Sequence, residues 1–247
     1  MKTMMLKDAD GAPSARTDAE VDMRMIETVT VPLRENTTEA PDDPVRGRIK
    51  AWMFRLLDAY FHRKYGDIKR EAFGGLPRVV VEIGAGTGAN LRYLDPGTRV
   101  IAIEPDVHMH RYLRAAAGRW HVPVDIRAAA PEGIPLPDGS VDAVMCSLVL
   151  CSVRDPARAL AEIRRVLRPG GRFWCLEHVA AAERTPLAHV QRAVARPWHW
   201  LFEGCDPRRD ITGLLRAAGF ASVEVSPFTL RTAIVPIRRH IAAVALR

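Results

Sequence analysis

The stretch Val-Glu-Ile-Gly-Ala-Gly-Thr-Gly at residues 81–88 decides the fold. It continues a β-branched run and precedes residues with helical periodicity. A strand that ends in three alternate glycines can turn tightly, and a ligand can then lie against bare backbone N–H groups. We therefore expect a strand at 79–83, a glycine turn, and a helix from about 88 to 94 whose positive end faces an anionic ligand group.

A second landmark lies twenty residues after Gly84, where Glu104 ends the apolar run Val100–Ile103. A carboxylate in this position accepts hydrogen bonds from two ribose hydroxyls. Nicotinamide enzymes use such a carboxylate, and so do enzymes that bind S-adenosylmethionine. The string Gly84–Ala89 also fits the G-x-G-x-x-A dinucleotide fingerprint. These two motifs alone leave the cofactor open.

Three further features separate the two classes. Glu82 lies two residues before the first glycine, where a carboxylate can meet the ammonium group of a ligand. Asp138–Val144 then leads into a fourth strand and Leu167–Gly171 into a fifth. This ordered set, over about residues 78–247, resembles the class I S-adenosylmethionine-dependent methyltransferases. The resemblance implies S-adenosyl-L-methionine as the cofactor.

Strand-like and helix-like segments alternate along the chain, which implies a mostly parallel sheet with helices on both faces. We expect a Rossmann-like α/β fold with seven strands in the family's order 3-2-1-4-5-7-6. The last two strands should pair antiparallel because a non-helical segment joins them. The expected strands are 79–83, 99–104, 122–127, 143–148, 172–176, 222–226 and 241–246, with helices near 109–116, from 156, and at 211–218.

The composition changes upstream of this domain. Residues 1–46 are rich in Asp, Glu, Thr and Pro and predict a flexible arm, in which the more apolar Met23–Leu33 either docks or stays loose. Residues 47–77 predict a helical lid, because aromatic and apolar residues repeat there at three- and four-residue steps. The methyltransferase domain covers 78–247, with a substrate-side insert at about 179–210.

In this family the cofactor lies at the carboxyl ends of strands one, two and four, beside the switch in strand order. Many relatives place an Asp after strand three for the adenine, whereas this chain has Ala129-Ala130-Pro131-Glu132. The backbone of Ala130 or the side chain of Glu132 would have to serve instead. The expected cofactor-binding residues are Glu82, Gly84, Ala85, Gly86, Gly88, Asn90, Glu104, Pro105, Ala130, Glu132 and Ser147.

The second half of the chain narrows the resemblance. Cys146–Val153, Leu176–Ala181 and Pro197–Cys205 are similar to the thiol S-methyltransferase branch of the methyltransferase-like proteins. This likeness implies S-methylation of a small-molecule thiol. Two alternatives stay open: O-, C- or N-methylation of a small secondary metabolite, and a cofactor-binding scaffold without catalysis.

Thiol methylation needs little machinery beyond alignment of donor and acceptor. A free thiol has a pKa of about 8.5 and is mostly protonated near pH 7, so a histidine that takes the proton or stabilises the thiolate would help. The candidate catalytic residues are His178, just after strand five, and His199, in the insert. The substrate pocket is expected to include Tyr60, Tyr65, Leu148, Trp198 and Cys205, for which plain core packing is the alternative.

Composition argues against several other classes. The net charge is +7, but the Arg residues are scattered and aromatic residues make up only 6%, so no nucleic-acid surface is expected. No apolar stretch is long enough for a membrane span and no signal peptide is evident, so a cytoplasmic location is expected. The four cysteines show no C-x-x-C or Cys/His metal spacing, so neither a metal nor a disulfide is expected. A homo-oligomer is left open.

Overall fold

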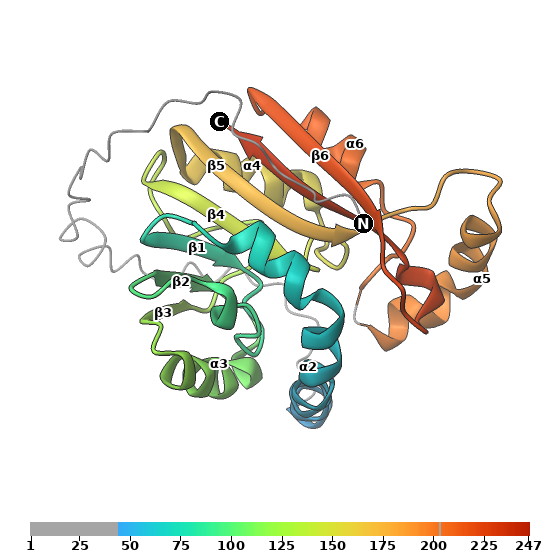
Figure 1. Cartoon of the computed structure of the whole chain (residues 1–247), viewed down its shortest axis with the longest axis horizontal. Coiled ribbons are helices and arrows are strands. Elements are labelled where there is room, and N and C mark those ends of the chain that lie inside the picture. Colours follow the sequence, from blue (N-terminus) through green and yellow to red (C-terminus); the bar gives the residue numbers. More distant parts are fainter. Residues whose placement is uncertain (1–43, 203) are drawn as a thin grey trace. The chain divides into compact units, whose positions relative to one another are not determined.

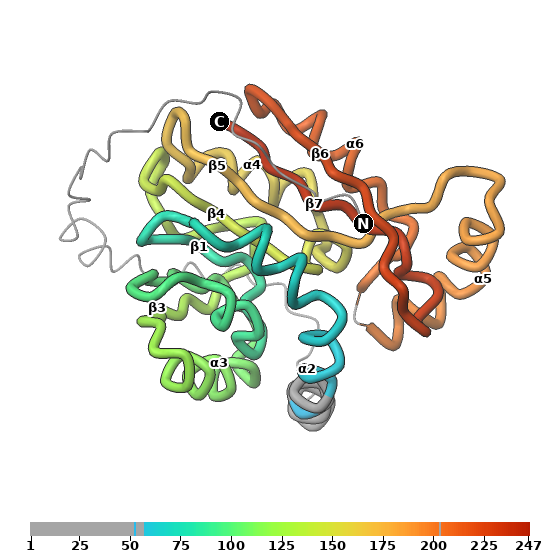
Figure 2. Tube along the Cα trace, viewed as in Figure 1, coloured from blue at the N-terminus to red at the C-terminus, as the bar shows by residue number. Residues whose placement is uncertain are grey.

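A seven-stranded sheet organises the part of the chain that the computed structural model describes, residues 44–202 and 204–247 (Figure 1). The strand order β3-β2-β1-β4-β5-β7-β6 confirms the expected topology. Strands β1 to β5 pair in parallel, whereas β7 pairs antiparallel with both β5 and β6, between which it lies in Figure 2. The strands are β1 Val79–Ile83, β2 Arg99–Ile103, β3 Val124–Arg127, β4 Val141–Ser147, β5 Leu167–His178, β6 Ser222–Thr229 and β7 Arg239–Leu246.

The central strands are apolar on both faces, as expected for parallel strands that helices cover on each side. Four of the five residues in β1 and in β2 are buried. In the middle of the sheet, Val81 is the register partner of Ile101 on one side and of Val144 on the other. This core fixes the height at which β1, β2 and β4 end, and therefore where their carboxyl-end loops meet.

Two groups of helices flank the sheet. Helix α2, the 3₁₀ helix η1 and helix α3 contact one another, and α4 contacts α6. Figure 1 shows α2 in front of the sheet and α4 and α6 behind it. Helix α5 contacts the 3₁₀ helix η2. The bounds are α2 Pro44–Phe73, η1 Leu91–Tyr93, α3 Val107–Trp120, α4 Pro156–Val166, α5 Pro186–Leu201, α6 Ile211–Ala217 and η2 Val235–Ile237.

Capping residues set where the helices begin. Asp106 and Asp155 each accept a hydrogen bond from the first turn of the helix that follows, and Pro156 occupies the first position of α4.

None of the helices in the described ranges is long and apolar enough to cross a membrane.

The predicted helix at 88–94 is wrong. Residues 84–90 form turns, and only the single 3₁₀ turn of η1 follows them. The N–H of Gly88 donates to Ala85 and that of Leu91 donates to Gly88, so this segment is built from tight three-residue steps. Gly88, where the predicted helix would begin, has a φ of 79°, which lies outside the helical region. The end of β1 therefore presents the backbone of a turn and not the first turn of an α-helix.

The predicted arm at 1–46, with its apolar segment Met23–Leu33, lies outside the described residues as far as residue 43. Pro44–Arg46 already belong to α2, which therefore begins three residues before the predicted lid.

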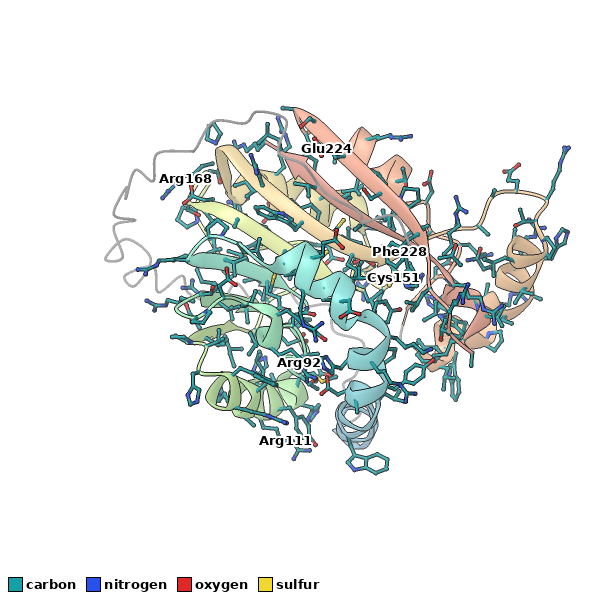
Figure 3. All side chains as sticks on the ribbon, in the orientation of Figure 1. Arg92, Arg111, Cys151, Arg168, Glu224 and Phe228 are labelled. Atoms are coloured by element: carbon teal, nitrogen blue, oxygen red, sulfur yellow. The ribbon has the colours of Figure 1, made fainter. Side chains whose placement is uncertain are left out.

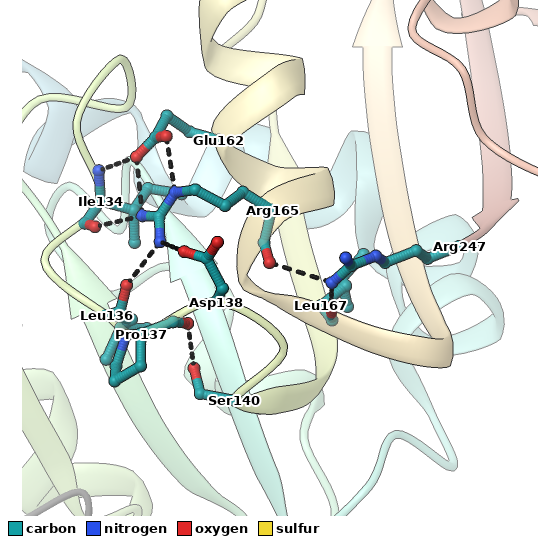
Figure 4. Close-up of polar contacts among 9 residues, drawn as sticks. All are labelled: Ile134, Leu136, Pro137, Asp138, Ser140, Glu162, Arg165, Leu167 and Arg247. Atoms are coloured by element: carbon teal, nitrogen blue, oxygen red, sulfur yellow. Dashed lines mark hydrogen bonds and ion pairs between the residues drawn. The ribbon is translucent and has the colours of Figure 1, made fainter.

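An arginine on α4 fixes the segment that joins β3 to β4 (Figure 4). The guanidinium of Arg165 donates to the carbonyl oxygens of Ile134 and Leu136, at 2.8 and 2.9 Å. It also donates two hydrogen bonds to the carboxylate of Glu162, at 2.7 and 2.9 Å, and these raise the pKa of Arg165 above its ordinary value. The entry into β4 is thus held against α4.

Candidate active site

The glycine turn after β1 packs on one side and is open on the other. The N–H of Gly84 donates to the carbonyl of Ile103 at 2.8 Å, and a Cβ on Gly84 would lie 2.6 Å from the side chain of Val149. A Cβ on Gly86 would meet nothing closer than a carbonyl oxygen at 4.0 Å. Both glycines have positive φ angles, which other residues rarely adopt. The turn therefore packs against the loop after β4 at Gly84, and the space beside Gly86 is open to a ligand.

Ala85 and Gly88, also predicted as cofactor-binding residues, are buried within the turn. A Cβ on Gly88 would lie 2.8 Å from the Cβ of Ala116 on α3. We expect both residues to shape the turn through packing.

Glu104 lies where β2 ends and touches the glycine turn. Its side chain is buried, and its carboxylate accepts hydrogen bonds from the N–H of Gly86 at 2.7 Å and from the N–H of Asp106 at 2.9 Å. Pro105, the next residue, is exposed at the rim. The fold thus brings together the two motifs that the sequence analysis linked, with a carboxylate beside an open glycine backbone.

A buried hydrogen-bonded chain lies under this turn. The Lys69 ammonium donates to the side-chain oxygen of Asn90 at 2.7 Å, and the Asn90 amide donates to Glu82 at 2.7 Å. Burial raises the pKa of Glu82 to about 7 and lowers the pKa of Lys69 to about 8. The second carboxylate oxygen of Glu82 is buried with no hydrogen-bond partner among the described residues. A buried acceptor without a donor suits a ligand that brings a cation.

Three of the predicted cofactor-binding residues, Ser147, Glu132 and Ala130, have different surroundings. The hydroxyl of Ser147, the last residue of β4, is buried and has no partner in the described ranges. The carboxylate of Glu132 accepts a hydrogen bond from the N–H of Asp155 at the start of α4. Ala130 is exposed at the rim. We therefore favour the backbone of Ala130 over the side chain of Glu132 for the adenine.

The loop after β4 is held by a second buried carboxylate. Glu177 accepts hydrogen bonds from the N–H groups of Val149 and Leu150, at 2.8 and 2.9 Å. Leu148, a predicted pocket residue, has a φ of 60°, which is uncommon for a residue with a branched side chain. Glu177 therefore fixes two backbone amides of this loop.

Three side chains meet beyond this loop, from three segments of the chain. His178 ends β5, and its Nε2 lies 3.1 Å from Sγ of Cys205. Sγ of Cys205 lies 3.9 Å from Sγ of Cys151, which Figure 3 labels. The indole N–H of Trp198 also donates to Cys205, at 3.2 Å. The hydrogen bond with Cys151, reinforced by those with His178 and Trp198, lowers the pKa of Cys205 to about 4 despite its burial.

This sulfur cluster (Cys151, His178 and Cys205) separates the two candidate histidines. His178 is buried inside it, whereas His199 is exposed on α5. Sequence reasoning missed Cys151 as a candidate, because it stands in a run of apolar residues and no short-range Cys or His spacing points to it.

Aromatic residues of α2 contact His240 at the start of β7 and Thr232 before it. The Tyr65 hydroxyl lies 2.9 Å from Nε2 of His240, the register partner of His178, and Phe228 stacks on His240. The Tyr60 hydroxyl lies 2.7 Å from that of Thr232. Tyr65 is fully buried and its hydroxyl links α2 to β7, whereas Tyr60 is partly exposed.

A pocket of about 260 Å³ lies between α2, η1 and α3, with Thr87 to Ala89 of the glycine turn in its wall. Of the predicted cofactor residues it includes only Gly88. We assign the cofactor instead to the carboxyl edge of the sheet, because the open Gly86 backbone and the unpartnered Glu82 and Ser147 oxygens lie there. Those groups fit a ligand with an ammonium, a ribose and further polar atoms.

The comparisons with known proteins agree with this geometry. A family model described as a methyltransferase domain matches residues 81–175. The chain is 34% identical over 198 residues to human thiol S-methyltransferase TMT1A, across 76% of this chain and 81% of that protein. It is 31% identical over 207 residues to human thiol S-methyltransferase TMT1B, across 79% of this chain and 85% of that protein.

Solved structures share the fold at low sequence identity. A geranyl diphosphate methyltransferase in complex with S-adenosylmethionine has a TM-score of 0.58 and 15% identity, over 85% of this chain and 93% of that one. The YcgJ protein of Bacillus subtilis has a TM-score of 0.58 and 16% identity, over 75% of this chain and 98% of that one.

Proposed function

Since the chain belongs to the class I S-adenosylmethionine-dependent methyltransferases, in the family of the thiol S-methyltransferases, we propose that it methylates the sulfur of a small-molecule thiol. The enzyme class and the cofactor follow from the family. The assignment of a thiol as the methyl acceptor rests on the activity named for the two human relatives.

We assign the cofactor's polar groups to four residues. Glu104 accepts the ribose hydroxyls, and Gly86 leaves room for the chain that bears the sulfonium. Glu82 pairs with the ammonium group and Ser147 bonds a neighbouring polar atom, since an oxygen of each lies buried with no partner from the described chain. The bound cofactor supplies an electrophilic methyl group, so the protein mainly aligns the acceptor with it.

The acceptor side, in our assignment, is the loop after β4 together with the sulfur cluster. Glu177 holds the Val149 and Leu150 amides in place, which fixes this loop against the glycine turn. His178 is our candidate for the group that keeps the acceptor sulfur as a thiolate, and Trp198 and Leu148 complete the pocket. The reaction suits the cytoplasm, where thiols stay reduced, and the four cysteines of this chain are free thiols.

The proposal is tested by measuring the methyltransferase activity of the full-length protein with a series of acceptors. Release of S-adenosylhomocysteine should occur with alkyl and aryl thiols and not with phenols or amines of the same skeleton. In His178→Ala, turnover should fall by about 10²-fold or more for alkyl thiols and by less for acidic aryl thiols, because the latter are already ionised. His199→Ala is the matched control and should retain activity, since its ring is exposed on α5. Equal turnover of phenols and thiols would contradict the thiol assignment.

A further inference from the structure

The sulfur cluster has the composition of a metal site. Cys151 follows β4, His178 ends β5, and Cys205 lies between α5 and α6. All three side chains are buried, and their ligand atoms lie within 4.8 Å of one another. The sequence analysis expected no metal because these residues stand 27 positions apart, so only the fold brings them together.

The distances suit tetrahedral zinc. With Zn–S bonds of about 2.3 Å and Zn–N bonds of about 2.0 Å, two sulfur ligands lie about 3.8 Å apart, and a sulfur and a nitrogen about 3.5 Å apart. The sulfurs of Cys151 and Cys205 lie 3.9 Å apart, and Nε2 of His178 lies 3.1 Å from Cys205. A ring nitrogen of His178 and Sγ of Cys151 lie within 4.8 Å of each other, so a cation would fit after a rotation of the histidine ring adjusts its distances to the two sulfurs.

The donor set selects the metal. Two thiols and an imidazole, with no hard oxygen donor, favour zinc over magnesium or calcium. Two thiolates also neutralise one Zn²⁺, so the loaded site carries no net charge into its buried surroundings. Three protein ligands leave the fourth tetrahedral position open, which is typical of catalytic zinc sites.

The loops that bear the two cysteines are braced against each other. The N–H of Asp206 donates to the carbonyl of Cys151 at 2.9 Å. The guanidinium of Arg209 donates to the carbonyl oxygens of Leu150 and Val153, both at 2.7 Å. With the Trp198 N–H on Cys205, these bonds hold the donors in place before any ligand arrives.

We propose that Cys151, His178 and Cys205 bind one zinc ion, whose open position takes the acceptor thiol. This role rests on the proposed function, whereas the metal site itself does not. Here His178 stabilises the acceptor thiolate through the zinc ion that it holds. As the acceptor sulfur binds the cation, its proton leaves to water. A sulfur lone pair then forms the bond to the methyl carbon while the bond from that carbon to the sulfonium sulfur breaks, and the departing sulfur keeps the electron pair. The neutral thioether is a weaker ligand and dissociates.

Metal binding can be measured without turnover. Purified full-length protein with reduced thiols is titrated with Zn²⁺ in competition with a chromogenic chelator, and with Co²⁺ to record the thiolate-to-cobalt charge-transfer band. We expect one equivalent of zinc with submicromolar affinity. Cys151→Ala and Cys205→Ala should each weaken it by at least about 100-fold and reduce the cobalt band. Cys175→Ala, which removes a buried strand thiol outside the cluster, is the matched control and should bind normally.

If a variant fails to fold, the cobalt spectrum of the wild-type protein still tests for thiolate ligands. A spectrum without that band, or zinc affinity unchanged in Cys205→Ala, would overturn the proposal. The two proposals fail separately: a protein that methylates thiols but binds no zinc overturns only the metal site. A protein that binds zinc through these residues but methylates no thiol leaves the site standing and overturns its role.

Discussion

Replacing Glu104 with alanine should weaken S-adenosylmethionine binding by about ten- to a hundredfold. The carboxylate accepts hydrogen bonds at 2.7 and 2.9 Å from the N–H groups of Gly86 and Asp106, so it lies against the turn that faces the ligand. A hydrogen bond to a charged group contributes about 1.5–3 kcal/mol, and each 1.4 kcal/mol changes the dissociation constant about tenfold. The variant loses the ribose contact and also loosens the turn.

Isothermal titration calorimetry on the folded variant measures this loss, with the thermal midpoint as a check on the fold. Glu104→Gln is the matched control, because it keeps the size of the side chain and one acceptor oxygen while it removes the charge. Its affinity should fall between those of the wild type and the alanine variant. Equal affinity in all three proteins would remove Glu104 from the cofactor site and refute the assignment of that edge.

Three further predictions test other parts of the site and the fold. Gly86→Ala should fold with a small loss from its φ of 55° yet bind cofactor at least about tenfold more weakly, whereas Gly88→Ala should lower the thermal midpoint because its Cβ meets Ala116 at 2.8 Å; normal binding by Gly86→Ala would make the turn merely structural. Cofactor affinity should decline as the pH falls through about 7, since Glu82 then takes up a proton and cannot pair with an ammonium, and calorimetry on Glu82→Gln should show this dependence gone. A persistent slope would point to another group. Arg165→Met should cost about 2 kcal/mol in the free energy of unfolding, measured by denaturant titration, and change cofactor affinity by less than about threefold, because three of its five hydrogen bonds hold the segment before β4 and the other two go to Glu162 of α4; an unchanged unfolding energy would show that the network is redundant.

Local sequence patterns predicted the sheet because each strand carries its own signal. The β-branched run before the glycine turn and the apolar run before Glu104 mark β1 and β2 to within one residue. The non-helical link before the last strand correctly indicated its antiparallel pairing. The prediction of a helix at 88–94 failed because the turn conformation extends past Gly88, whose positive φ no sequence period reveals.

The acceptor side was harder to predict because its contacts span long sequence distances. Cys151, His178 and Cys205 meet only after three strand or helix ends are placed, and no short spacing announces such a cluster. Periodicity also gave no means to rank His178 above His199, whereas burial in the fold separates them at once. The positions of Glu82, Gly86 and Glu104 were easier to predict, because each has a fixed place relative to a strand end.

The most direct test of thiol methylation is the identity of the product. The enzyme is incubated with S-adenosylmethionine that carries a deuterated methyl group, and with an aryl thiol, its phenol and its aniline in one mixture. Mass spectrometry then locates the label. We predict a labelled thioether formed in step with S-adenosylhomocysteine, and unlabelled phenol and aniline. Label on oxygen or nitrogen with the thiol unchanged would contradict the account.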